Sequence, residues 1–124
     1  MACGALQILR RMPHPLFQHL RLPVIASPLF IISVPQLVIA QCKAGIVGSM
    51  PAPNARPAEL VDDWLAEITE TLAAHDRAHP EAPAAPFAIN QIVHKSNDRL
   101  EHDMEVVVRR KVPIIITSLG ARPD

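Results

Sequence analysis

The stretch PQLVIAQCKAGIVGSM, residues 35–50, decides the fold because it joins a helical pattern to a strand pattern at a glycine. Pro35 stands at a favourable first helical position, where the missing N–H of proline costs nothing. Gly45 is placed to end this helix in the left-handed conformation. Residues 46–50 (IVGSM) are typical of a buried strand. The apolar side of the predicted helix consists of Leu37, Val38, Ile39 and Cys42.

Strand and helix patterns continue to alternate on both sides of this stretch. Upstream, Val24–Ser27 is a short apolar run that is typical of a buried parallel strand. Downstream, Pro57 opens a second predicted helix, and residues 75–86, rich in alanine, proline and charge, predict a linker. The apolar positions of the second helix share the spacing of one helix face: Leu60, Val61, Trp64, Leu65, Ile68 and Leu72.

The last third of the sequence predicts one more helix between two strands. Phe87–Asn90 is expected to form the third strand, and Val112–Thr117 the fourth. Asn97 is a suitable N-cap for the helix between them. The stripe that this helix should bury consists of Leu100, Met104, Val107 and Val108.

Four predicted strands alternating with three helices indicate a parallel α/β sheet with right-handed crossovers. A doubly wound open sheet and part of a TIM (β/α)8 barrel both fit this order. A whole barrel needs about 250 residues, whereas this sequence has 124 and ends directly after the fourth strand. A doubly wound domain usually ends on a covering helix. We therefore expect the first four strands and three helices of a barrel over residues 22–124, preceded by a leader or tail over residues 1–21.

Composition and charge exclude several classes of protein. Twelve basic and twelve acidic side chains give a net charge of zero, so no nucleic-acid partner is expected. Cys3 and Cys42 lack the spacing of a metal site or a disulfide scaffold, which predicts no metal and a cytoplasmic location. The uncharged run over residues 23–40 is divided by Pro28 and Pro35, so we expect no membrane span.

Ligands of both architectures gather at the carboxyl ends of the parallel strands. The residues at these predicted ends have small, amide or hydroxyl side chains, with one histidine and no acid. Such groups suit a flat neutral ring held by amide and backbone hydrogen bonds, and they do not suit a carboxylate pair or a hard metal. The polar candidates are Ser27, Ser49, Asn90, Gln91, His94, Thr117 and Ser118.

Each polar candidate also has a purely structural interpretation. Asn90 and Gln91 can cap the loop after their strand, and His94 fits a surface loop. Cys42 lies on a predicted buried helix face, where packing is expected rather than nucleophilic chemistry. The sequence contains no Walker phosphate loop, no GxGxxG fingerprint and no GxSxG elbow.

Several runs, in this order and spacing, resemble the start of the nitronate monooxygenase family, also called 2-nitropropane dioxygenase-like. These runs are Leu22–Leu29, Gln36–Val38, Cys42–Ser49, Pro86–Asn90 and Val112–Gly120, so the resemblance covers nearly everything from residue 20 onward. It implies a TIM barrel that binds FMN at its carboxyl face and oxidises alkyl nitronates with O2.

The resemblance also implies which residues contact the flavin. The implied cofactor-binding residues are Ser27, Pro28, Leu29, Asn90, Thr117, Ser118 and Gly120. The catalytic histidine of the family and the glycine loops that grip the FMN phosphate are expected beyond the fourth strand. The resemblance therefore assigns no catalytic residue within this sequence.

The loop after the first strand departs from the family pattern. Family members commonly have Ala-Pro-Met-Gly-Gly there, whereas this sequence has Ser27-Pro28-Leu29-Phe30-Ile31. Bulky apolar side chains replace both glycines, which predicts a loop of another shape.

Three functions are consistent with these observations. The first is an FMN-dependent nitronate monooxygenase, with a nitronate and O2 as its small-molecule partners. The second is a related FMN barrel reductase of the enoyl-reductase type, which an activity driven by NAD(P)H would reveal. The third is a non-catalytic half-barrel that pairs with a second copy through its open strand edges. The resemblance favours the first for the family, and the missing half favours the third for these 124 residues alone.

Overall fold

A computed structural model describes residues 14–121 of the chain. Helices and strands alternate from residue 35 onward, which confirms the mixed α/β class. Residues 1–13 of the expected leader lie outside the described residues. The elements, in chain order, are the 3-10 helix η1 (Pro15–Phe17), α2 (Pro35–Ala44), β1 (Gly48–Pro51), the 3-10 helix η2 (Ala52–Asn54), α3 (Leu60–Ala78), β2 (Phe87–Ile92), α4 (Leu100–Arg109) and β3 (Ile114–Ser118).

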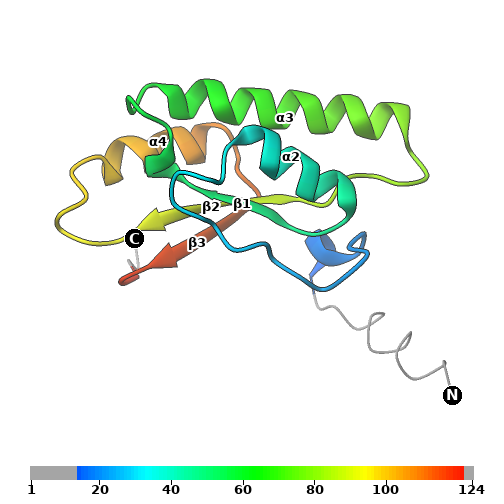
Figure 1. Cartoon of the computed structure of the whole chain (residues 1–124), viewed down its shortest axis with the longest axis horizontal. Coiled ribbons are helices and arrows are strands. Elements are labelled where there is room, and N and C mark those ends of the chain that lie inside the picture. Colours follow the sequence, from blue (N-terminus) through cyan, green and yellow to red (C-terminus); the bar gives the residue numbers. More distant parts are fainter. Residues whose placement is uncertain (1–13, 122–124) are drawn as a thin grey trace, which may run out of the picture.

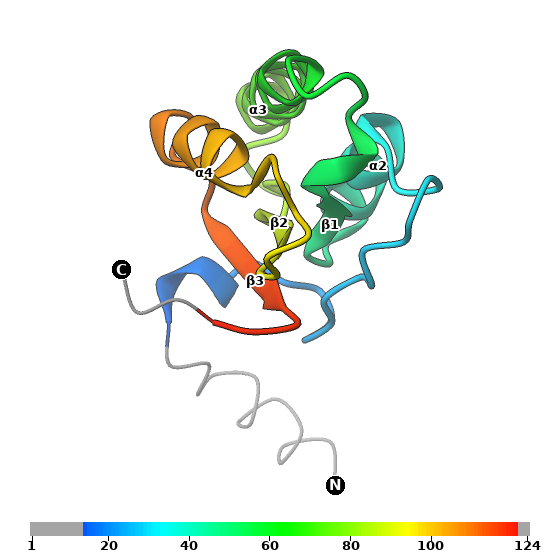
Figure 2. The ribbon, with the colours of Figure 1, turned by 90° about the vertical axis from the view of Figure 1, so that its left-hand side faces the viewer.

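The three strands form one parallel sheet in the order β1-β2-β3, which is also their order along the chain. Gly48 lies beside Phe87, and Ala88 lies beside Ile114. Helices α2, α3 and α4 cover the same face of the sheet, as Figures 1 and 2 show. This arrangement follows from right-handed crossovers that all step in one direction along the sheet.

The run Val24–Ser27, predicted to be the first strand, does not form a full strand of the sheet. Within the described residues, this run contributes a single parallel bridge, between Ile25 and Val47. Hydrogen bonds from Ala26 N to Val47 O (2.8 Å) and from Val47 N to Val24 O (3.1 Å) hold it beside β1. Pro23 and Pro28 flank the run, and a proline has no N–H to extend the ladder.

Helix α2 matches the prediction at both ends. Pro35 occupies its first turn, and Gly45 follows it with φ 94°, in the left-handed region. A Cβ atom at Gly45 would also lie 2.5 Å from Cγ of Arg21. Backbone conformation and space therefore both select glycine here.

The bounds of α3 differ from the prediction. The helix begins at Leu60 rather than Pro57, and it continues to Ala78, through the first residues of the predicted linker. Alanines at positions 73, 74 and 78 are strong helix formers, and they extend the helix beyond its last buried residue, Leu72.

Helix α4 differs both at its start and in its buried face. Asn97 is not the N-cap, because its Nδ2 donates to Ile92 O (2.9 Å) and the helix begins at Leu100. Val108 was expected to be buried but is 69% exposed. The buried residues of the helix are Leu100, Asp103, Val106 and Val107.

Asp103 is the buried carboxylate of α4, and the sequence analysis did not identify it. Its side chain is fully buried and accepts hydrogen bonds from Nε (2.7 Å) and Nη2 (3.0 Å) of Arg99. Arg99 also donates to Ala55 O (2.6 Å). This ion pair, in which Asp103 is buried and Arg99 is half-buried, ties the start of α4 to the loop after β1, and tertiary contact rather than a local cap fixes the helix start.

The main core lies between the sheet and the three helices. It joins Val38 and Cys42 of α2 to Leu65 of α3 and to Met50 and Ile89 of the sheet. Burial raises the pKa of the Cys42 thiol to about 11, and its Sγ lies 3.5 Å from Pro86 O. The structure therefore confirms that Cys42 packs in the core.

None of the helices in residues 14–121 combines the length and apolar character needed to cross a bilayer.

Candidate functional site

Asn90 lies at the centre of the edge where the parallel strands end. It belongs to β2, the middle strand, and the residue is only 7% exposed. Its Nδ2 donates to Ile116 O (3.0 Å) and to Ser118 Oγ (3.1 Å), both on β3. Because both amide hydrogens have acceptors, the orientation of the group is fixed, and Oδ1 is the atom that can accept from a ligand.

The implied flavin-contacting residues do not all share one face of the sheet. Side chains alternate along a strand, so Asn90 and Ser118 lie on the face turned away from the helices. Gln91 and Thr117, which are register partners, lie on the helix-covered face and line a common pocket. The structure therefore brings Asn90 and Ser118 together and separates Thr117 from them.

The backbone leading to Ser27 is fixed beside β1. Ser49 Oγ donates a hydrogen bond to Ala26 O, and Ser49 N donates to Gln41 Oε1 (3.3 Å). Ser27 is exposed and Pro28 is half-buried, at the carboxyl end of this extended segment. Both residues therefore follow the parallel segment at the same edge of the sheet as Asn90.

The loop after this segment is held by one side chain from the next connection. Asn54 Nδ2 donates to Leu29 O (2.9 Å) and to Ser33 O (2.8 Å), while its Oδ1 accepts from Ile31 N (3.0 Å). Ser33 Oγ accepts from Leu29 N (2.8 Å). Sequence reasoning missed Asn54, because an asparagine between prolines gives no signal of partners more than twenty residues away.

Ile31 takes a backbone conformation that favours glycine. Its φ is 67°, in the left-handed region that a β-branched residue rarely adopts. The resemblance places a glycine at this position. Ile31 therefore adopts a backbone conformation that glycine would adopt without strain.

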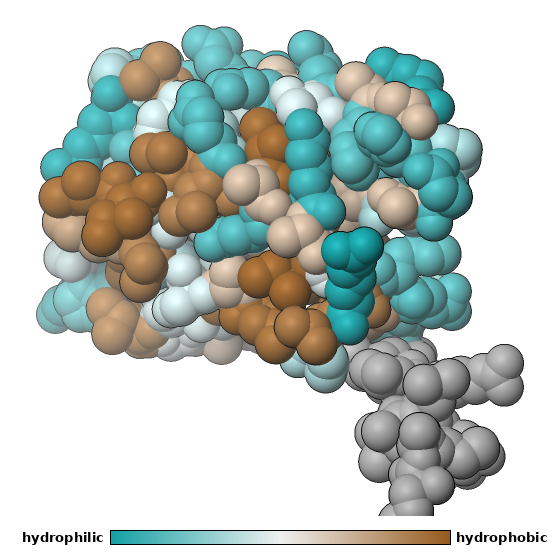
Figure 3. Space-filling model, turned by 45° about the vertical axis from the view of Figure 1, so that its right-hand side comes forward, coloured by the Kyte–Doolittle hydropathy of each residue, from teal (hydrophilic) through white to brown (hydrophobic). Residues whose placement is uncertain are grey.

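The same loop exposes four consecutive apolar side chains, Leu29, Phe30, Ile31 and Ile32. The guanidinium carbon of Arg56 lies 5.1 Å from the centre of the Phe30 ring. In the space-filling view, hydrophobic surface gathers on the side of the molecule where this segment lies (Figure 3). The carboxyl edge of the sheet thus has an ordered apolar neighbour.

Gly120 and His94 are the remaining candidates at this edge. Val93 N donates to Ser118 O (2.8 Å), and a Cβ atom at Gly120 would lie 3.0 Å from Val93 O, so the chain passes close to β2 there. His94 is exposed, and its Nδ1 lies 2.7 Å from Ser96 Oγ. These contacts confirm the surface-loop interpretation of His94.

Across residues 14–121 no group of three or more histidine, cysteine, aspartate or glutamate side chains is arranged to hold a metal ion. The edge therefore offers one oriented amide, hydroxyl groups and an apolar loop. This set can hold a neutral ring by hydrogen bonds and apolar contact.

No protein-family model, curated protein or solved structure matches the chain.

Proposed function

We propose that the chain forms the ring-binding edge of an FMN-dependent oxidoreductase of the nitronate monooxygenase type, built on a (β/α)8 barrel. The observation that carries the proposal is the Asn90 amide, whose orientation Ile116 O and Ser118 Oγ fix at the carboxyl ends of the strands. Ligands of parallel α/β folds bind at this edge.

The order of the strands supports the barrel. Sequential parallel strands with every helix on one face are the repeating unit of a barrel, whereas a doubly wound sheet reverses its strand order and carries helices on both faces. The sheet has the order β1-β2-β3. The bridge between Ile25 and Val47 places one more parallel segment outside β1, where the first strand of a barrel would lie.

The groups at this edge suit the ring of FMN. Asn90 Oδ1 can accept from the N–H of the pyrimidine part of the ring. Leu29–Ile32 supply apolar surface of the kind that covers an aromatic ring and excludes water. When bound, FMN would take electrons from the nitronate and pass them to O2. The role of the chain is then to orient the ring and to shield it.

Flavin retention tests this proposal directly. The purified chain is mixed with FMN, excess flavin is removed, and absorbance in the flavin bands is recorded together with molar mass by light scattering. We expect a yellow, stoichiometric complex. A colourless oligomer would overturn the proposal and support the non-catalytic half-barrel.

The electron donor distinguishes the two flavin activities. Under anaerobic conditions, we expect propyl-2-nitronate to bleach the bound flavin and NADPH to leave it oxidised. Bleaching by NADPH alone would contradict a nitronate-oxidising activity and support the enoyl-reductase type.

A further inference from the structure

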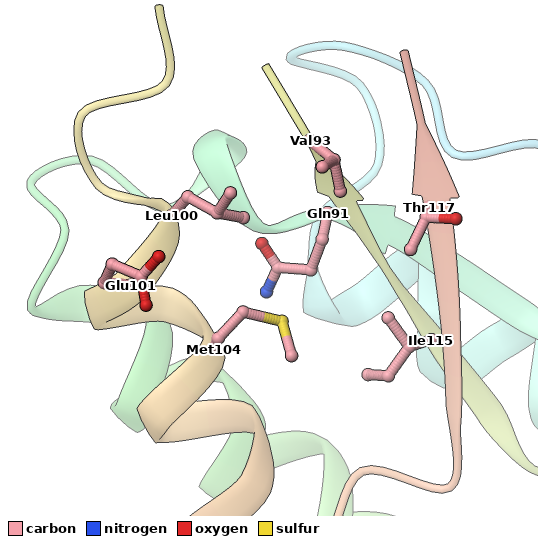
Figure 4. Close-up of a pocket in the computed structure, with 7 residues that line it drawn as sticks. All are labelled: Gln91, Val93, Leu100, Glu101, Met104, Ile115 and Thr117. Carbon is pink, nitrogen blue, oxygen red and sulfur yellow. The ribbon is translucent and has the colours of Figure 1, made fainter. Parts of the chain in front are cut away.

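A pocket of about 270 Å³ lies between α4 and β3, on the helix-covered face of the sheet. Figure 4 shows its residues, which come from α4, from β3 and from the end of β2. They include Gln91, Val93, Leu100, Glu101, Met104 and Ile115. The pocket is on the opposite face from Asn90 and is therefore separate from the proposed flavin edge.

Gln91 is the unusual residue of this pocket. Its side chain is fully buried, and neither Nε2 nor Oε1 makes a hydrogen bond within the part of the chain that the structure describes. In Figure 4 its amide group lies between Leu100 and Met104. A buried amide without partners destabilises a fold, so such a group indicates a partner that completes it.

The surroundings of Gln91 define the chemistry of that partner. Leu100, Met104 and Ile115 form apolar walls, and Thr117 turns its hydroxyl away from Gln91 (Figure 4). Glu101 is the charged lining residue, and a carboxylate disfavours an anionic ligand. A ligand that suits these walls is small, neutral and largely apolar.

We propose that this pocket binds a small neutral ligand through a carboxamide or lactam edge that pairs with the amide of Gln91. The carbonyl of the ligand accepts from Nε2, and its N–H donates to Oε1, so both orphaned atoms gain a partner. Because Gln91 has no exposed surface, a covering side chain must move to admit the ligand. Met104, which is unbranched and has three rotatable bonds, is suited to that movement.

Benzamide is the probe for this proposal, and benzoate is its anionic counterpart. The full chain is titrated with each while side-chain amide resonances are followed by ¹⁵N NMR. We expect benzamide to shift the Gln91 NH2 resonances and benzoate to bind at least tenfold more weakly. Equal binding of the two probes, or benzamide binding that leaves the Gln91 resonances unmoved, would overturn the proposal.

Variants separate the role of the amide from the role of the apolar walls. Gln91→Leu keeps the approximate volume and should weaken benzamide binding at least tenfold while raising the melting temperature, because it removes an unpaired buried amide. Asp63→Asn, on the exposed side of α3 and outside this pocket, should leave benzamide binding unchanged. Unchanged benzamide binding in Gln91→Leu, or absence of binding to the wild-type chain, would contradict the proposal. Excess FMN should not displace benzamide, since the two sites lie on opposite faces.

Discussion

At the scale of single residues, the loop beside the carboxyl edge holds its shape against a local conformational cost. Ile31 has φ 67°, although a β-branched side chain disfavours that region. The hydrogen bond from Ile31 N to Asn54 Oδ1 helps to impose this conformation. Strained residues of this kind persist where the surrounding structure holds them, and they are common at functional sites.

Glycine at this position should relieve the strain. Left-handed strain costs about 1–3 kcal/mol, and the added freedom of a glycine in the unfolded chain offsets roughly 0.5–1 kcal/mol of that. We therefore expect Ile31→Gly to raise the free energy of unfolding by about 1 kcal/mol, as measured by urea denaturation. The neighbouring Ile32, which is exposed but has no positive φ, is the matched control, and Ile32→Gly should be neutral or destabilising. Equal effects of the two substitutions would contradict this account of the loop.

Single residues of the site were predictable to different degrees. Asn90 was identified from sequence because an amide at a strand end is better suited to binding than to packing. Thr117 was grouped with Ser118, but neighbouring residues of a strand face opposite ways, and register with Gln91 places it on the helix side. The missing partners of Gln91 could not be predicted, since they depend on the packing of α4 against the sheet.

At the scale of elements, a charged contact joins α3 to α4. Asp62 accepts hydrogen bonds from Nε and Nη2 of Arg110, both at 2.7 Å, and from Nη2 of Arg109 at 2.9 Å. The hydrogen bonds from Arg110 and then Arg109 hold the pKa of Asp62 well below its usual range. Local sequence patterns do not show which helices become neighbours, so this contact could not be predicted from the sequence.

This contact predicts a pH-dependent contribution to stability. A carboxylate whose pKa is lower in the folded state stabilises the fold above its unfolded-state pKa of about 4 and loses this effect as pH falls. The stability advantage of the wild type over Asp62→Asn should therefore be largest near neutral pH and shrink below about pH 4. Urea denaturation at low salt measures it, because salt screens exposed pairs.

The neighbouring carboxylate provides the control for this effect. Asp63 is exposed beside Asp62, and Asp63→Asn should change stability little at any of these pH values. Equal stability of Asp62→Asn and the wild type at neutral pH and low salt would show that the contact contributes nothing to the packing of α3 against α4.

The order of the elements was predictable from hydrophobic periodicity, whereas several bounds were not. Helix α2 has local signals at both ends, Pro35 and Gly45, and was predicted correctly. The start of α4 depends on the ion pair of Arg99 and Asp103, because Arg99 also donates to the distant Ala55 O. Local patterns do not contain such contacts, so the sequence indicated Asn97 as the N-cap instead.

At the scale of the whole molecule, the strands follow chain order and the helices cover one face of the sheet. Alternation of helix and strand predicted parallel pairing, but it did not decide between a sequential order and a reversed one. Parallel pairing places the carboxyl ends of the strands along one edge, and Asn90 of the middle strand lies at the centre of that edge. Our central claim is that this edge binds the ring of FMN.

An equilibrium titration of FMN, followed by quenching of flavin fluorescence, tests this claim most directly. Ser118 is a positioning residue, since its Oγ accepts one of the two Asn90 hydrogen bonds. Loss of this bond should weaken FMN binding by roughly 3- to 10-fold in Ser118→Ala, while Thr117→Val, one residue away on the opposite face, should bind like the wild type. Absence of FMN binding to the wild type, or equal affinities for the wild type and Ser118→Ala, would contradict the claim.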